Sequence, residues 1–230
     1  MISHEHKCIF IHIPKCAGSS FEKLLGHFDE YSGRERQDHR SVRMIQQPVN
    51  YIDVIRSTEN VKDYIRRIRE YTRTQKNPKN RLTVNSSQYK EYFKFTLIRN
   101  PWDRLFSWYK NVQRDQAHQK NYNIPSDISF LDFVKRFAGT GYLRPQTYWL
   151  EQFDGTINLD YVGKFEELDS VFSTVVSKLN LPGAPELPHE VHGSEKKTQK
   201  PYCQEVVDFI ANYYQEEISL FDYSVPEISE

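Results

Sequence analysis

Residues 8–21 read CIFIHIPKCAGSSF, an apolar run that ends at a proline and leads through small residues into a helical pattern. The run is rich in β-formers and Pro14 stops it, so residues 8–13 are predicted to form a buried strand. Ser19 and Ser20 can cap the helix that follows. Helix amides, the positive end of the helix dipole and the Lys15 ammonium can converge on one anion. The stretch predicts a phosphate site.

A second stretch, FTLIRNPWDRLFS at residues 95–107, has the same order of strand, basic turn and helix. Residues 92–98 are predicted to form a buried strand, and Pro101 stands where a helix begins. Trp102 is expected in the core, and Arg104 is expected to pair with Asp103 or Glu91. Two anion sites suggest a ligand with two phosphate ends.

Further helical patterns at 129–138, 142–153, 166–180 and 202–219, with a short strand near 161–163, complete the outline. Strands that alternate with helices predict an α/β fold with a mainly parallel central sheet flanked by helices. The length fits a single domain over residues 1–230. Ligands in such folds bind at the carboxyl ends of the strands, where both stretches fall.

A helix is also predicted around residues 61–71, where apolar side chains recur at helical spacing. The apolar face of this helix is expected to comprise Val61, Tyr64, Ile65, Ile68 and Tyr71. The arginines on its remaining faces, Arg66, Arg67, Arg69 and Arg73, are expected to be solvated, which is how amphipathic helices ordinarily pack. A surface for an acidic substrate is the alternative.

The composition excludes several function classes. The chain has 31 Lys and Arg and 31 Asp and Glu, so no overall charge steers it to nucleic acid or an anionic membrane, and any anion site must be local. No window approaches the roughly 20 apolar residues of a membrane span, and no export signal is evident. Three cysteines at unrelated spacings favour a reducing, cytoplasmic location. No set of metal ligands is evident.

The order of residues in the first stretch differs from that of a nucleoside triphosphatase loop, in which lysine directly follows the last glycine. Here Lys15 precedes Gly18, and two serines follow. The two stretches together resemble the sulfotransferases that use 3′-phosphoadenosine 5′-phosphosulfate (PAPS), in the branch with carbohydrate (Golgi-type) and small bacterial sulfotransferases. Residues 130–134, 162–168 and 221–223 also resemble that branch, whereas residues 31–90 resemble it weakly.

This resemblance implies a P-loop-like site for PAPS, with PAP as the product and no metal. Lys15 would act catalytically by neutralising the leaving phosphate, Arg99 and Ser107 would bind the ribose 3′-phosphate, and Lys197 would come from a loop that closes over the nucleotide. The acceptor implied is a hydroxyl of a carbohydrate or glycolipid. The residues implied to cradle the phosphosulfate are Pro14, Lys15, Cys16, Ala17, Gly18, Ser19, Ser20 and Phe21.

The reaction also needs a base for the acceptor hydroxyl. His39, in the loop after the first helix, is the preferred candidate because an imidazole titrates near neutral pH. His12, His189 and His192 remain alternatives. Gln146 and Tyr148 are candidates to line the acceptor cleft.

Two other functions stay open on the sequence. A non-catalytic PAP- or PAPS-binding protein would keep Lys15, Arg99 and Ser107 and tolerate loss of the base. A P-loop-like nucleotide kinase would need a magnesium-binding loop in the usual order, which this sequence does not show.

Overall fold

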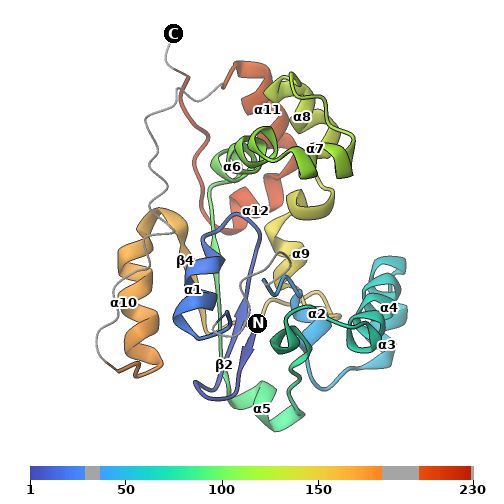
Figure 1. Cartoon of the computed structure of the whole chain (residues 1–230), viewed down its shortest axis with the longest axis vertical. Coiled ribbons are helices and arrows are strands. Elements are labelled where there is room, and N and C mark those ends of the chain that lie inside the picture. The colour runs from blue at the N-terminus through green and yellow to red at the C-terminus, as the bar shows by residue number, and fades with distance from the viewer. Residues whose placement is uncertain (29–36, 183–201, 229–230) are drawn as a thin grey trace. The chain divides into compact units, whose positions relative to one another are not determined.

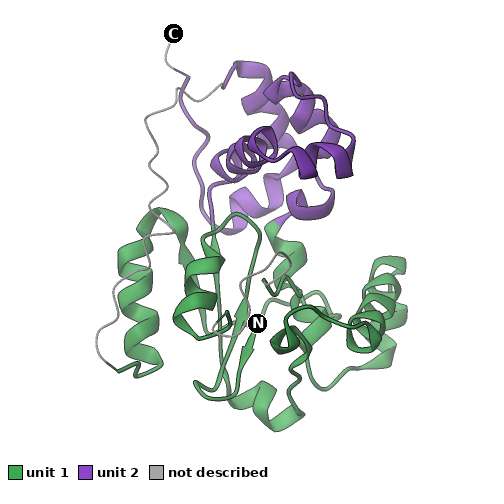
Figure 2. Ribbon diagram, viewed as in Figure 1, with its two compact units in different colours: residues 1–98, 146–193 green, residues 99–145, 194–230 purple. Residues whose placement is uncertain are grey.

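The computed structural model describes residues 1–28, 37–182 and 202–228. The described chain separates into two compact units, which Figure 2 shows in different colours. Unit 1 comprises residues 1–98 and 146–193, and unit 2 comprises residues 99–145 and 194–230. The chain thus leaves unit 1 and returns to it. The expectation of one domain over the whole chain stays a prediction.

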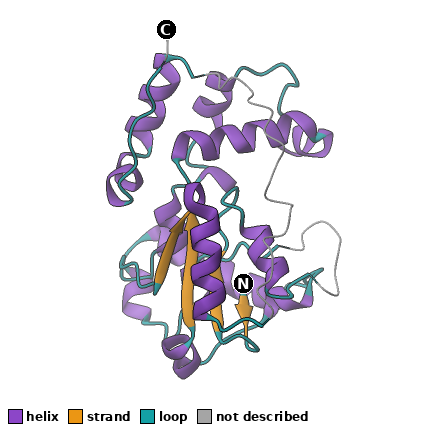
Figure 3. Cartoon of the chain, turned by 90° about the vertical axis from the view of Figure 1, so that its left-hand side faces the viewer, coloured by secondary structure: helices purple, strands orange, loops and turns teal. Residues whose placement is uncertain are grey.

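Unit 1 is built on a four-stranded sheet in the order β1-β2-β3-β4, flanked by helices as Figure 3 shows. Its strands are β1 (Ile2–Ser3), β2 (Cys8–Ile11), β3 (Phe93–Ile98) and β4 (Tyr161–Lys164). β2, β3 and β4 are parallel, and β1 adds an antiparallel edge in the register Ile2↔Ile9. The predicted α/β fold with a mainly parallel sheet is confirmed; the short edge strand was not predicted.

The described part of unit 1 also contains seven α-helices (Figure 1): α1 (Gly18–Leu24), α2 (Val42–Ile45), α3 (Tyr51–Ile55), α4 (Thr58–Thr72), α5 (Ser86–Glu91), α9 (Gln146–Leu150) and α10 (Leu168–Lys178). One face of the sheet has an aromatic core. Phe10 and Phe95 are partners in the β2–β3 register, with ring centroids 4.8 Å apart. Phe21 of α1 packs against both rings and against Phe172 of α10. Burial of these rings holds α1 and α10 on the sheet.

Helix α4 has the opposite orientation to the one its sequence predicts. Its buried residues are Asn60, Asp63 and Arg67, whereas Ile65 and Ile68 are exposed. Arg67 donates hydrogen bonds to the carbonyls of Arg43 and Gln46. The prediction of a buried apolar face was wrong because these buried polar contacts, and not the apolar stripe, fix the rotation of the helix.

Unit 2 is helical, with α6 (Pro101–Arg114), α7 (Gln116–Tyr122), α8 (Phe130–Phe137), α11 (Gln204–Tyr213) and α12 (Gln215–Leu220). Trp102 is fully buried in its core, as predicted. Arg104 is also fully buried, and it donates to the carbonyls of Tyr142 and Arg144 and lies 3.8 Å from the Glu217 carboxylate. The sequence did not predict the contact with Glu217, because this residue comes from a helix distant in sequence.

Among the helices that the structure describes, none combines the length and apolarity that crossing a bilayer requires.

Gly163 of β4 supports a test of this packing. A Cβ at this position would lie 2.5 Å from Cγ1 of Val171 on α10. Gly163→Ala should therefore lower the free energy of unfolding by about 1–3 kcal/mol, measured by denaturant titration.

The matched control is Gly163→Ala combined with Val171→Ala, which removes the methyl groups that the new Cβ would meet. The double variant should lose less stability than the sum of the two single variants, since the two changes relieve each other. Strictly additive losses would show that Val171 does not limit the space at residue 163.

Candidate active site

The loop between β2 and α1 has an unusual backbone. Lys15 and Ala17 both adopt left-handed conformations, with φ of 71° and 62°. Each such residue costs about 1–2 kcal/mol without glycine, and strain of this kind is found where a chain is shaped for function. The loop is therefore shaped by the surrounding fold and not by local preference.

Helix α1 begins at Gly18, and its N-cap is Ala17, with no side-chain cap hydrogen bond. Ser19 and Ser20 lie in the first turn, so the prediction that they cap the helix was wrong. The backbone amides of Gly18 and Ser19 lie at the helix start, where no intrahelical carbonyl can accept from them. This is the end of a helix that favours an anion.

Gly18 is required by its contact with His12. A Cβ on Gly18 would lie 2.0 Å from Cδ2 of the His12 ring. His12 directly follows β2 and is buried, with 2% of its surface exposed. Only glycine lets α1 begin this close to the strand.

Several predicted cradle residues have side chains that point into the protein. Cys16, Ser20 and Phe21 are all buried, as is Pro14. Lys15 and Ser19 are half-buried, so their side chains are the accessible ones.

Gln146 is fully buried, and the Cys16 thiol donates to its Oε1 over 3.5 Å. The prediction that Gln146 lines an open cleft was wrong, because it packs beneath the loop. Tyr148 is half-buried, and its hydroxyl donates to Asp63 over 2.9 Å.

His39 is brought against the first loop by a hydrogen bond from its Nδ1 to the His12 carbonyl, 3.1 Å away. A carbonyl can only accept, so Nδ1 carries a proton and Nε2 is the basic nitrogen of the neutral ring. Burial, and to a smaller extent the neighbouring His12, lowers the pKa of His39 to about 4. At neutral pH the imidazole is neutral, the form that a base needs.

Gln37 connects His39 to the loop. Its amide nitrogen bonds the Ser19 hydroxyl, and its Oε1 lies 3.3 Å from Nε2 of His39. In this orientation the Gln37 oxygen can accept from a protonated His39 Nε2. If the Gln37 amide turned by half a turn, its NH₂ group could donate to the Nε2 of the neutral ring. Gln37 was not among the predicted residues, because the polar sequence around it contains no motif that indicates a function.

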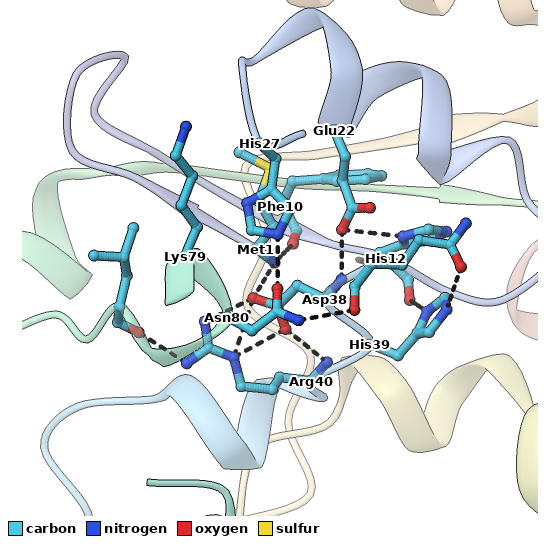
Figure 4. A network of polar contacts seen from close by, with 12 residues as sticks. Met1, Phe10, His12, Glu22, His27, Asp38, His39, Arg40, Lys79 and Asn80 are labelled. Atoms are coloured by element: carbon cyan, nitrogen blue, oxygen red, sulfur yellow. Dashed lines mark hydrogen bonds and ion pairs between the residues drawn. The ribbon is translucent and has the colours of Figure 1, made fainter. Parts of the chain in front are cut away.

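The residues on either side of His39 belong to a network of buried hydrogen bonds and ion pairs, which Figure 4 shows. Asp38 accepts from Nε and Nη2 of Arg40 at 2.9 and 2.6 Å. Burial opposes ionisation of Asp38, but the Arg40 charge and hydrogen bonds hold its pKa well below the ordinary value. The Asp38 amide donates to Glu22 of α1 over 2.9 Å, which ties the His39 segment to the helix.

His12 is a poor candidate for the base. Its Nδ1 lies 3.1 Å from the Glu22 carboxyl in the interior. Burial lowers the pKa of His12 to about 3, and it raises the pKa of Glu22. The His12 ring serves to pack on Gly18, and its carbonyl orients His39. Glu22 was missed because a carboxyl in an amphipathic helix ordinarily faces solvent.

Arg99 and Ser107 belong to unit 2, as the residue after β3 and a residue of α6. Arg99 is 9% exposed and Ser107 is half-buried. Asn100 is the N-cap of α6, and its side chain accepts from the amides of Trp102 and Asp103. The asparagine thereby fixes the turn that carries Arg99.

The remaining predicted residues, Lys197 with His189, His192 and Lys196, lie outside the described residues. In the part of the chain that is described, no group of three or more His, Cys, Asp or Glu side chains is arranged to hold a metal ion.

Comparison with known proteins places these features in a family. The model of the sulfotransferase family matches residues 1–224, which run through both units. The chain belongs to the sulfotransferase family. Carbohydrate sulfotransferase 14 from Danio rerio is 21% identical over 265 residues, covering 98% of this chain and 62% of that protein. The Homo sapiens protein of the same name is 20% identical over 264 residues, covering all of this chain and 61% of the relative.

This sulfotransferase-family chain therefore spans about three fifths of the length of both relatives. No solved structure matches it. Membership of this family explains why the two sequence stretches resemble those of sulfotransferases. The left-handed loop before α1 lies in the first of these stretches.

The contact between Gly18 and His12 can be tested by Gly18→Ala. The added methyl group should displace the His12 ring and lower the free energy of unfolding by about 1–3 kcal/mol. Lys23→Ala, on the exposed face of the same helix, should stay within about 0.5 kcal/mol of the parent. Denaturant unfolding measures both, and equal stability of the two variants would contradict the steric role of Gly18.

Proposed function

We propose that this protein transfers a sulfuryl group from PAPS to a hydroxyl of a carbohydrate or glycolipid. The observation that carries the proposal is the strained loop at residues 14–18, with a half-buried lysine, in a chain matched by the sulfotransferase family over residues 1–224.

In this proposal the acceptor oxygen attacks the sulfur of PAPS while the bond from sulfur to the 5′-phosphate oxygen breaks. PAP leaves with the electron pair of that bond. The Lys15 ammonium lies on the loop that would hold the departing phosphate, so it stabilises the charge that develops there. The amides of Gly18 and Ser19 add donors at the helix start.

His39 takes the acceptor proton at Nε2. The hydrogen bond from its Nδ1 to the His12 carbonyl supports this role, because it holds the ring with the basic nitrogen directed away from the strand. Gln37 lies between that nitrogen and Ser19, so it can follow the proton by turning its amide.

Arg99 and Ser107 bind the 3′-phosphate, the group that distinguishes PAPS from ATP. A guanidinium suits this role because it donates two parallel hydrogen bonds to phosphate. The low exposure of Arg99 supports the assignment, since a partly desolvated arginine binds an anion more strongly than a solvated one.

Both relatives are named as carbohydrate sulfotransferases, which supports a carbohydrate acceptor. A screen of oligosaccharides, glycolipids and phenols with labelled PAPS tests the acceptor class directly. Transfer to phenols alone would overturn this part of the proposal.

Donor binding is tested by calorimetry with PAP and with ATP and magnesium. The protein should bind PAP more tightly than ATP with magnesium. Arg99→Ala should weaken the binding free energy of PAP by about 1.5–3 kcal/mol, which is the value of a charge-assisted hydrogen bond. Arg114→Ala, at the exposed end of α6, is the matched control and should leave affinity unchanged. Preference for ATP with magnesium would refute the proposal.

The base is tested by His39→Ala, which should lower transfer by about 10²–10⁴-fold and spare PAP binding. His6→Ala is the control for loss of an imidazole. Because a base must be deprotonated and the pKa of His39 is lowered to about 4, transfer by the parent should hold well below neutral pH and fall only as pH approaches that value. A midpoint near the ordinary histidine pKa would contradict the assignment.

A further inference from the structure

Helix α4 turns its apolar side outward. Val61, Ile65 and Ile68 follow one another at helical spacing of four and three residues, so they form one stripe. Their exposed fractions are 37%, 51% and 48%. A stripe of this kind ordinarily faces a core.

This orientation is fixed from the opposite side of the helix. Asp63 is fully buried and pairs with Arg43 at 3.1 Å and with Arg66 at 2.6 Å. Arg67 is buried on two carbonyls, and Asn60 donates to the carbonyls of Asp53 and Phe153. Rotating the helix to bury its isoleucines would leave these polar groups without partners, at about 1–3 kcal/mol for each.

Helix α3 extends the same surface. It packs against α4, and the rings of Tyr51 and Tyr64 meet edge-on with centroids 5.9 Å apart. Tyr51, Ile52 and Ile55 are exposed by 65%, 66% and 75%. We call these three side chains together with Val61, Ile65 and Ile68 the α3–α4 face. Exposed apolar side chains gathered on neighbouring elements mark interaction sites.

The polar residues beside the α3–α4 face are mainly basic. Residues 51–76 contain seven Lys or Arg and four Asp or Glu, although the whole chain is formally neutral. One acid, Asp63, and one base, Arg67, are buried, so the excess of basic residues is the same among the remaining ones. At 100° per residue, Lys62, Arg69 and Arg73 fall along one flank of the apolar stripe, and all three are exposed.

We propose that the α3–α4 face docks on the surface of a bilayer that contains anionic phospholipid. The isoleucines enter the boundary between headgroups and acyl chains, Tyr51 lies at the interface, and the basic flank contacts lipid phosphates. This is the side-chain arrangement of helices that lie in a membrane surface. The proposal does not depend on the sulfotransferase activity.

Charge complementarity favours lipid over a second copy of this chain as the occupant. In a symmetric dimer the same face would meet itself, and each basic flank would find no matching acidic strip. The nearby acids Glu59 and Asp53 are half-buried and engaged locally, Glu59 with Lys62 at 3.4 Å and Asp53 with Arg56 at 3.0 Å. An anionic bilayer supplies the missing negative charge.

The test is co-sedimentation of the full chain with vesicles of phosphatidylcholine containing about one fifth phosphatidylglycerol, and with phosphatidylcholine vesicles alone. The protein should bind the anionic vesicles more tightly, and added salt should weaken that binding. Equal binding to both vesicles, or binding to neither, would overturn the proposal.

Two variants separate the apolar and basic contributions. Ile55→Ser with Ile65→Ser should weaken binding at least tenfold, and Arg69→Gln with Arg73→Gln should weaken it by roughly tenfold or more. The controls are Leu220→Ser with Val225→Ser, which are exposed by 54% and 53% in unit 2, and Lys90→Gln on α5. The controls should bind like the parent.

Thermal unfolding of every variant should match the parent, because the changed side chains are exposed. Light scattering tests the alternative occupant of this face, a second copy of the chain. If the parent is a dimer that the isoleucine variant dissociates, and vesicles do not sediment the parent, the α3–α4 face is an interface between two copies and the lipid proposal is wrong.

Discussion

The close contact between Gly18 and the ring of His12 is the constraint on which the candidate site depends. It brings the start of α1 against the end of β2, and the chain that joins them passes through left-handed conformations at Lys15 and Ala17. The same residue, His12, orients His39 through its carbonyl. A single buried histidine thus contacts both the start of α1 and the neighbouring imidazole, because its ring packs on Gly18 and its carbonyl accepts from His39.

Buried ion pairs also position the segments around the candidate site. Asp38 with Arg40 fixes the segment before α2, and Asp63 with Arg43 fixes α4. Charges held away from water must find partners, so each pair allows few arrangements of the elements that carry it. The half-buried His39 therefore lies on a segment that is anchored on both sides, to α1 through Glu22 and to the carbonyl of Leu82 through Arg40.

The strands and most helices could be predicted because their signals are local. Residues 8–11 and 93–98 are apolar and β-rich, and Pro101 marks a helix start that the structure places at the same residue. The parts of the site that could not be predicted depend on residues distant in sequence. Gln37 matters only because the fold brings it between Ser19 and His39, and Arg104 is matched by Glu217 from another helix.

The sequence by itself determined the α/β class, the two strand-to-helix junctions with their basic residues, and the resemblance that the family match bears out. Only the tertiary structure decided which face of α4 is buried. Periodicity reports that a helix has an apolar side, but it does not say what the rest of the chain offers as a partner. Here the chain offers carbonyls and charged side chains to Asn60, Asp63 and Arg67, and satisfying those buried groups outweighed burying the isoleucines.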